Sequence, residues 1–194
     1  MMEPMAVAVH AMRRFHIEKD SSVCVIGLGT IGLLLTMFLK AEGIQNVYVE
    51  GNKDMQKHFA QKLGVDDEHY NADNVVADYV FECVGKNETI NRAIELAAPA
   101  GNIVFVGNPY SDMNIPKDTY WKILRKQLKL SGTWNSSYAG ESGDDWHYVL
   151  NKLADGRINP EQFITHEYPL DAIQKGMEIM RDKSEDYVKV MCIS

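Results

Sequence analysis

A glycine-rich turn followed by an acidic residue has the residue types and spacing best suited to chemistry in this sequence. Residues 27–32 match the pattern G-x-G-x-x-G directly after an apolar run, and Glu50 closes the next apolar run about 20 residues further on. The glycines of such a turn permit a tight bend, close approach of a pyrophosphate, and close packing of the following helix. Gly27, Gly29 and Gly32 are therefore expected at the pyrophosphate, and the exposed N–H groups of the following first turn would receive its negative charge.

Glu50 predicts which dinucleotide the turn would bind. Its carboxylate would accept hydrogen bonds from the ribose hydroxyls of an adenosine and would repel a 2′-phosphate, so we expect NAD rather than NADP. Two other interpretations stay open: glycines that serve packing alone, and an S-adenosylmethionine (SAM)-dependent methyltransferase-like domain, whose turn and acid look alike. Residues 101–109, GNIVFVGNP, favour a nicotinamide because they add a second small-residue loop at the same edge of the sheet.

Strands and helices alternate along the chain in the way that this motif requires. Short apolar, β-branched runs predict strands at residues 22–27, 46–50, 78–85, 101–107, 128–134 and 187–193. Segments bounded by start and stop signals predict helices at residues 4–14, 30–41, 54–63, 88–97, 116–126, 144–153 and 169–181. This alternation predicts one α/β domain over residues 1–194, a doubly wound parallel sheet of the Rossmann type with helices on both faces.

The composition limits the class of protein. The chain has 194 residues, 45% of them hydrophobic, so it can bury a substantial core. Its net charge of −7 argues against nucleic acid and anionic membranes as partners, and its longest apolar run, residues 23–39, falls short of the ~20 apolar residues of a membrane span. Cys24, Cys83 and Cys192 stand alone in apolar runs, which predicts buried thiols in a cytoplasmic protein without disulfides.

Several longer motifs together resemble the cofactor-binding half of a zinc-type medium-chain dehydrogenase/reductase. They are EPMAVAVHA, VIGLGTIGLL, VYVEGNKD, FECVG, GNIVFVGNP, LRKQLKLSGTWNSS and YPLDAIQKGMEIM…VKVMCI, which cover almost the whole chain. The Glu-Pro start and the motif RKQLKLSGTWNSS are more similar to the polyol branch, the sorbitol and galactitol-1-phosphate dehydrogenases. The resemblance implies NAD-linked, zinc-dependent oxidation of an alcohol, a sugar alcohol or its phosphate.

The resemblance also implies further cofactor contacts, with Thr30 and Ile31 beside Gly29 in the pyrophosphate loop. Val84 and Gly85 match the turn beneath the adenosine, and Lys189 matches a basic residue that reaches the pyrophosphate, although a solvated lysine at a strand edge explains Lys189 equally well. Polyol members often have an arginine where this chain has Met55, which predicts different adenosine contacts there. The residues that match the stretch beside the nicotinamide are Val106, Gly107, Asn108, Thr133, Trp134 and Asn135.

Glu3 is the residue that the resemblance connects with zinc. In the polyol branch the glutamate of this Glu-Pro pair lies beside the catalytic zinc, where standard alcohol dehydrogenases have a cysteine. Capping of the helix at the domain junction, residues 1–14, explains Glu3 equally well. The family's catalytic, GroES-like domain with its zinc ligands should precede Glu3, so we expect zinc only in the full-length enzyme. For this chain alone we expect no catalytic residue and NAD binding without turnover.

The predicted partners are a small polyol or alcohol substrate and further copies of the chain. Cofactor domains of this family pair through the edge strand, here Leu128 to Trp134, and an exposed apolar edge strand otherwise invites aggregation. We therefore expect a homodimer or a higher homo-oligomer. A stand-alone NAD(H)-binding regulatory module remains a different class of function for the same residues.

Overall fold

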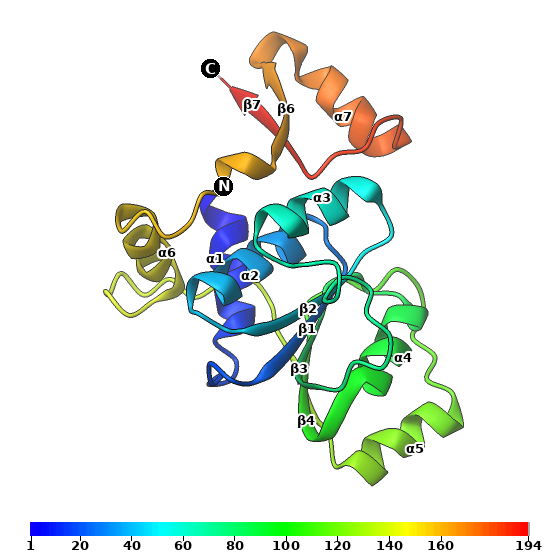
Figure 1. The fold of residues 1–194 in the computed structure, drawn as a ribbon. Coiled ribbons are helices and arrows are strands. Elements are labelled where there is room, and N and C mark those ends of the chain that lie inside the picture. The colour runs from blue at the N-terminus through cyan, green and yellow to red at the C-terminus, as the bar shows by residue number, and fades with distance from the viewer. Residues whose placement is uncertain (194) are drawn as a thin grey trace. The chain divides into compact units, whose positions relative to one another are not determined.

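The computed structural model of the protein describes residues 1–193 (Figure 1). It divides into two compact units, Met1–Ile158 and Asn159–Ser194, which we call the first unit and the second unit. The single domain over residues 1–194 that the sequence predicts stays a prediction.

A parallel sheet forms the centre of the first unit. Its five strands lie in the order β2-β1-β3-β4-β5, and each neighbouring pair is parallel. The strands are β1 (Ser22–Ile26), β2 (Asn46–Glu50), β3 (Ala77–Glu82), β4 (Ala97–Phe105) and β5 (Lys129–Gly132). An isolated parallel bridge joins Val49 of β2 to Tyr70. The doubly wound parallel sheet predicted from the sequence is confirmed.

Helices cover both faces of this sheet. They are α1 (Met2–Met12), α2 (Thr30–Ala41), α3 (Asp54–Lys62), α4 (Asn87–Leu96), α5 (Lys117–Lys126) and α6 (Asp145–Ala154). The step from β1 to β2 runs toward one edge of the sheet and the step from β3 to β4 toward the other, so right-handed crossovers place α2 and α4 on opposite faces. In Figure 1, α1 and α2 lie together on one side of the strands, and α4 and α5 lie together on the other.

Buried apolar side chains explain why these segments form a strand followed by a helix. The residues of β1 from Val23 to Ile26 are buried, as expected for a strand that is covered on both faces. Every residue of α2 from Gly32 to Leu39 is also buried, including Thr36, whose hydroxyl donates to the carbonyl oxygen of Gly32 at 2.8 Å. The glycine turn therefore joins two core elements, which fix its position.

Two strands end earlier than the sequence predicts at their carboxyl ends, on the side of the sheet where the glycine turn follows β1. β3 ends at Glu82 instead of Gly85, and β5 ends at Gly132 instead of Trp134. The small and polar residues beyond these ends form loops, since they do not continue the ladder of the sheet. Predicted site residues that were expected within strands therefore lie in loops just past the strand ends.

The second unit contains two strands and a helix. Its elements are η1 (Glu161–Phe163), β6 (Ile164–Pro169), η2 (Leu170–Ala172), α7 (Ile173–Asp182) and β7 (Lys189–Ile193). β6 and β7 form a parallel pair that α7 contacts. The sequence analysis missed β6 because none of its residues is buried and its composition is largely polar. The prediction that all three cysteines are buried is correct for Cys24, but Cys83 is only half-buried and Cys192 of β7 is exposed.

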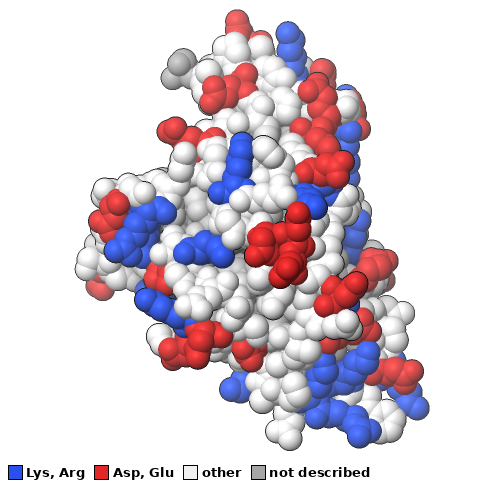
Figure 2. Space-filling view, in the orientation of Figure 1, with Lys and Arg blue, Asp and Glu red and all other residues white. Residues whose placement is uncertain are grey.

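Basic side chains gather over α5, whereas acidic and basic side chains alternate over the rest of the face seen in Figure 2. Arg125 and Lys126 lie in the last turn of α5, where cations are favourable at the negative end of a helix. The ammonium group of Lys126 also donates to the carbonyl oxygens of Glu95 and Ala97, at 2.7 Å each, at the end of α4. The ends of α4 and α5 therefore account for the positions of these two charges.

Candidate functional site

Backbone hydrogen bonds continue past the carboxyl ends of the strands and hold their loops together. In each loop a backbone N–H group donates to the carbonyl oxygen of the last residue of a neighbouring strand. The pairs are Gly27 to Glu50 (2.8 Å), Cys83 to Ile26 (2.9 Å), Val106 and Gly107 to Glu82 (2.8 and 2.9 Å), and Thr133 to Phe105 (3.1 Å). The loops that carry the predicted cofactor residues of the first unit therefore meet at one edge of the sheet, as the sequence analysis expects.

The glycines of the turn serve different purposes. Gly27 has φ +92°, a conformation that L side chains rarely adopt, and a Cβ atom on Gly32 would lie 1.9 Å from the carbonyl oxygen of Gly27. The fold therefore requires these two glycines. A Cβ atom on Gly29 would have no heavy atom within 4 Å, so the fold itself does not require Gly29. Open space at Gly29 fits a ligand that approaches the backbone closely.

The first turn of α2 is suited to an anion. Gly29 is the N-cap, no side chain caps the helix, and no acidic residue lies in its first turn. The N–H groups at such an end point outward and carry the positive end of the helix dipole. The arrangement at residues 29–32 therefore fits a pyrophosphate.

The loops after β3 and β4 touch through their backbones. Gly85 has φ +83°, and a Cβ atom on it would lie 1.8 Å from the carbonyl oxygen of Asn108. A Cβ atom on Gly107 would lie 2.2 Å from the backbone nitrogen of Gly85. Only glycine fits such a contact, so the predicted adenosine-side turn and the predicted nicotinamide-side loop form one continuous surface.

Glu82 shapes the turn that contains Val84 and Gly85, and the sequence analysis missed it. Its side chain is fully buried, and its Oε1 atom accepts hydrogen bonds from the backbone nitrogens of Val84 (2.9 Å) and Gly85 (2.8 Å) and from the hydroxyl of Thr89 (2.7 Å). Its Oε2 atom is buried and has no hydrogen-bond partner among residues 1–193. An acidic residue that ends a buried apolar strand is the sequence signal that points to such a role.

A cavity of about 210 Å³ lies where the nicotinamide is expected. Except for Val7, all of its lining residues were predicted as site residues: Glu3, Ile31, Val106, Asn108, Thr133, Trp134 and Asn135. The Oγ1 atom of Thr133 is buried and has no hydrogen-bond partner in the described part of the chain. A buried hydroxyl without a partner is unfavourable in the free protein, so the cavity fits a ligand with a polar group such as a carboxamide.

Glu3 does not form a metal site with other residues of this chain. It is an exposed residue in the first turn of α1 and lines the cavity described above. Within residues 1–193, no group of three or more His, Cys, Asp or Glu side chains could hold a metal ion. A catalytic zinc normally has three protein ligands, so the residues present do not fit a zinc site on their own.

Arg92 of α4 reaches the predicted ribose acid, and the sequence analysis missed this contact. Its Nε and Nη2 atoms both donate to Oε1 of Glu50, at 2.8 and 2.7 Å. The exposed fraction of the side chain is 40% for Arg92 and 19% for Glu50. The hydrogen bonds to Glu50 raise the pKa of Arg92, so the guanidinium stays charged. The two residues are 42 positions apart, and no local spacing in the sequence signals the pair.

The segment after Asn135 is anchored to two helices. The carboxylate of Asp145, at the start of α6, accepts hydrogen bonds from the backbone nitrogen of Ser137 (2.7 Å) and from Arg13 (3.0 Å), and it lies 2.8 Å from Nδ1 of His10. Asp144 caps α6 by accepting a hydrogen bond from the backbone nitrogen of His147 at 2.8 Å. These contacts fix the loop that follows the cavity.

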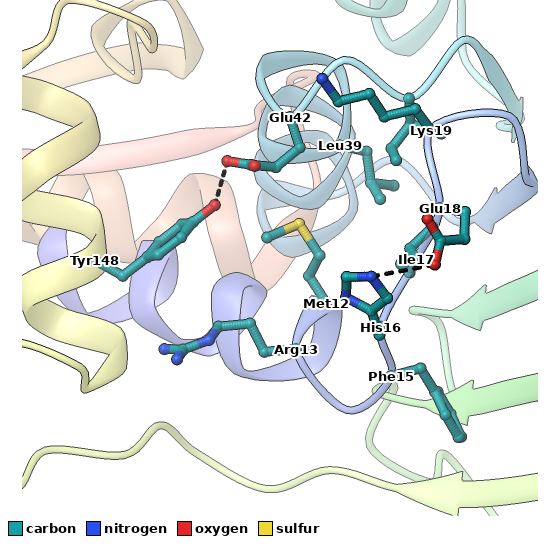
Figure 3. Close-up of a pocket in the computed structure, with 11 residues that line it drawn as sticks. Met12, Arg13, Phe15, His16, Ile17, Glu18, Lys19, Leu39, Glu42 and Tyr148 are labelled. Atoms are coloured by element: carbon teal, nitrogen blue, oxygen red, sulfur yellow. Dashed lines mark hydrogen bonds and ion pairs between the residues drawn. The ribbon is translucent and has the colours of Figure 1, made fainter.

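A larger cavity of about 320 Å³ lies on the other side of the sheet's strand ends, near the amino ends of β1 and β2 (Figure 3). It is lined by the end of α1, the segment before β1, and parts of α2 and α6. Figure 3 shows Tyr148 extending from α6 toward Glu42 at the end of α2; the hydroxyl donates to this carboxylate, which also pairs with Lys152. None of the predicted site residues lines this cavity, so the smaller cavity is the candidate site.

Lys189 lies at the first position of β7, in the second unit. It pairs in register with Ile164 of β6, and its carbonyl oxygen accepts a hydrogen bond from the hydroxyl of Thr165 at 3.2 Å. The predicted contact of its ammonium group with a pyrophosphate stays a prediction.

A comparison with models of known protein families shows which family the chain belongs to. The model of the family described as zinc-binding dehydrogenase matches residues 30–155, which is more than half of the chain. The chain belongs to the zinc-binding dehydrogenase family. The resemblance inferred from the sequence is confirmed at this level.

Relatives of this zinc-binding dehydrogenase chain are about twice as long. Galactitol 1-phosphate 5-dehydrogenase of Escherichia coli (strain K12) is 26% identical over 189 residues, which cover 91% of this chain and 54% of that protein. The chain thus spans about half the length of the curated relatives that it matches.

Solved structures share the fold. A short chain alcohol dehydrogenase of Escherichia coli CFT073 complexed with NADH has a TM-score of 0.84 at 21% identity, over 98% of this chain and 57% of that one. A zinc-binding dehydrogenase of Sinorhizobium meliloti 1021 bound to NADP has a TM-score of 0.81 at 23% identity, over 100% of this chain and 58% of that one. Among residues 1–193, no helix is both long and apolar enough to cross a membrane.

Proposed function

We propose that this chain is the cofactor-binding part of a zinc-dependent, NAD-linked alcohol or polyol dehydrogenase. The observation that carries the proposal is the convergence of the glycine turn, the ribose acid and the 210 Å³ cavity at one edge of a parallel sheet. Ligands of such sheets bind at this edge. Membership in the zinc-binding dehydrogenase family supports a nicotinamide cofactor over the SAM of a methyltransferase.

The residues of the chain have distinct tasks in this proposal. The turn at residues 27–32 binds the pyrophosphate, Glu50 binds the adenosine ribose, and Thr133 with Asn135 orients the nicotinamide. When bound, the nicotinamide supplies the hydride chemistry, while the protein supplies orientation. Val106, Ile31 and Val7 line the cavity with apolar side chains that exclude water from one side of the ring.

We further propose NAD as the preferred cofactor. Glu50 ends β2 beside the turn, where its carboxylate fits ribose hydroxyls and opposes a 2′-phosphate. Of the two solved structures with a similar fold, one contains NADH and the other NADP. They support a nicotinamide dinucleotide as the ligand but do not favour NAD over NADP.

The substrate class proposed is a sugar alcohol or its phosphate. Two relatives support this class by the substrates in their names: galactitol 1-phosphate 5-dehydrogenase and L-idonate 5-dehydrogenase of Vitis vinifera. The Vitis vinifera protein is 26% identical over 194 residues, which cover 92% of this chain and 50% of that protein. Glu3 stays a prediction as a neighbour of zinc in a longer protein. Because the described residues hold no set of zinc ligands, we expect no turnover by this chain alone.

Reduction of NAD by a panel of hexitols and hexitol phosphates tests this function. We expect a longer protein that joins this chain to a zinc-bearing catalytic domain to reduce NAD with at least one of these substrates and to lose the activity with chelators. The 194-residue chain should show no turnover under the same conditions. Robust oxidation of a polyol by the 194-residue chain alone would contradict the proposal, and so would a longer protein that binds NADH without oxidising any alcohol, which is the behaviour of a regulatory module.

A further inference from the structure

The contact between Arg92 and Glu50 is asymmetric. Both Arg92 donors, Nε at 2.8 Å and Nη2 at 2.7 Å, bind the same carboxylate oxygen, Oε1. In residues 1–193 the hydrogen bonds to the Glu50 side chain come from Arg92 alone, so Oε2 keeps its lone pairs for another donor. The guanidinium therefore fixes the direction in which the second oxygen points.

The pair lies beside the glycine turn. The carbonyl oxygen of Glu50 accepts a hydrogen bond from the backbone nitrogen of Gly27 at 2.8 Å, so the acid and the turn share one strand end. Both charges also act on Cys24 of β1: burial and Glu50 raise the pKa of this thiol, whereas Arg92 opposes them. Cys24 is fully buried, so both charges act close to the core of the sheet.

Arg92 also has donors that Glu50 does not use. A guanidinium carries five N–H donors, and the described hydrogen bonds of this side chain all go to Oε1 of Glu50. With 40% of its surface exposed, the side chain has room to bind a second group. Arginine binds phosphate in a two-donor geometry that lysine does not reproduce.

We propose that Arg92 is a second determinant of cofactor choice, which holds Glu50 for the 2′-hydroxyl of NAD and becomes a ligand for the 2′-phosphate of NADP when the charge of Glu50 is removed. This inference rests on the proposed function, since it assumes that the adenosine ribose lies at Glu50. In the native chain the two charges cancel, so a 2′-phosphate meets no net positive charge and must approach a carboxylate. Without the negative charge of Glu50, the positive charge of the guanidinium is no longer cancelled beside the glycine turn.

The test compares NADH and NADPH binding to the native chain, Glu50→Gln, Arg92→Met and the double variant by calorimetry at fixed salt. Glu50→Gln should shift the ratio of affinities toward NADPH by about ten- to hundredfold, the effect of a charge-assisted hydrogen bond to phosphate. Arg92→Met should weaken NADH binding by about threefold to tenfold because Glu50 loses its orientation, without a gain for NADPH. In the double variant the gain for NADPH should disappear.

Two further variants separate this role from a structural one. Glu95 of α4 forms an exposed ion pair with Lys122 at 2.9 Å, and Glu95→Gln should leave the NADH to NADPH ratio unchanged. Arg92→Lys keeps the charge but not the two-donor geometry, so in the Glu50→Gln background it should recover only part of the NADPH gain. Melting temperatures of all variants show that each is folded.

The outcomes distinguish the inference from the proposed function. A Glu50→Gln chain whose gain for NADPH persists after Arg92→Met would overturn the inference alone, because the phosphate would then be bound elsewhere. Equal NADH to NADPH ratios in the native chain and in all variants would overturn it as well. A folded native chain that binds neither dinucleotide would overturn the proposed function and the inference with it.

Discussion

A Cβ atom added to Gly85 would lie 1.8 Å from the carbonyl oxygen of Asn108, so these two residues hold the loops after β3 and β4 in direct backbone contact. One loop was predicted on the adenosine side of the site and the other on the nicotinamide side. Their contact means that both halves of a bound dinucleotide would rest on one rigid surface, so a change at Gly85 should disturb the fold and the site together.

Gly85→Ala should destabilise the first unit. The alanine methyl group meets backbone atoms that cannot move aside, and φ +83° is unfavourable for an L residue, so we expect a loss of about 2 kcal/mol or more in the free energy of unfolding. Denaturant unfolding measures this loss. Gly132→Ala is the matched control, because a Cβ atom there has no heavy atom within 4 Å. Equal stability of the two variants would show that the loops are not in tight contact.

Thr133→Val should weaken the binding of the nicotinamide half without destabilising the free chain. The Oγ1 atom is buried and has no hydrogen-bond partner within the described residues. Replacing the hydroxyl with a methyl group removes this unsatisfied polar atom and should leave the melting temperature equal or higher. NADH binding should weaken by about tenfold, whereas ADP-ribose, which lacks the nicotinamide, should bind as before. An equal loss for both ligands in calorimetry would remove Thr133 from the nicotinamide site.

The fold and the glycine turn could be predicted from the sequence because their signals are local. The apolar runs of β1 and β2, the pattern of residues 27–32, and the acid at residue 50 each follow from neighbours along the chain. The loop of residues 101–109, which lines the 210 Å³ cavity, was also anticipated from its small residues. Glu3 and Asn135 were anticipated only through resemblance to a family, since they are far apart in sequence.

Contacts between distant elements could not be predicted. Arg92 on α4 donates to Glu50 on β2, although β1 lies between β2 and the rest of the sheet. No periodicity in the sequence predicts this contact. Glu82 was missed because a buried acid contradicts the usual apolar pattern of a central strand; its partners are the backbone of the turn that follows. β6 was missed because it is a short strand without a buried face.

Acid should remove part of the stability of the first unit through Asp144. Burial acts to raise the pKa of this carboxyl, but hydrogen bonds from the backbone and ring of His147 and from the backbone of Ala139 outweigh burial and hold it well below the usual range. A lowered pKa stabilises the fold above the unfolded value of about 3.9, and this stabilisation is lost as the pH falls further.

Asp144→Asn keeps an N-cap oxygen but removes the charge, so it isolates this effect. The variant should melt several degrees below the native chain at pH 7, and the difference should shrink as the pH falls from about 4 toward 2. Thermal unfolding monitored by circular dichroism over this range measures it. A difference that stays constant with pH would show that the charge of Asp144 does not stabilise the cap.

The edge strand β5 should mediate a dimer. In the first unit only β4 pairs with β5, and Leu130 is 43% exposed on it. A second copy of the chain that pairs with this edge strand would bury Leu130 and form hydrogen bonds with the unpaired backbone N–H and C=O groups of β5. We expect the native chain to be at least a dimer in analytical ultracentrifugation and Leu130→Lys to shift it toward monomer. Glu95→Gln serves as the surface control, and a native chain that is monomeric at micromolar concentrations would exclude this interface.

The central claim is that the turn around Gly29 binds a nicotinamide dinucleotide, and calorimetric titration of the 194-residue chain with NADH tests it most directly. Gly29→Leu provides the comparison, because open space surrounds Gly29 and the variant should fold as stably as the native chain. We predict binding to one site in the native chain and a loss of about a hundredfold or more in Gly29→Leu, whose side chain occupies the place of the pyrophosphate. A native chain that is folded but gives no binding heat with either NADH or NAD, or a Gly29→Leu chain that binds NADH as tightly as the native chain, would contradict the account.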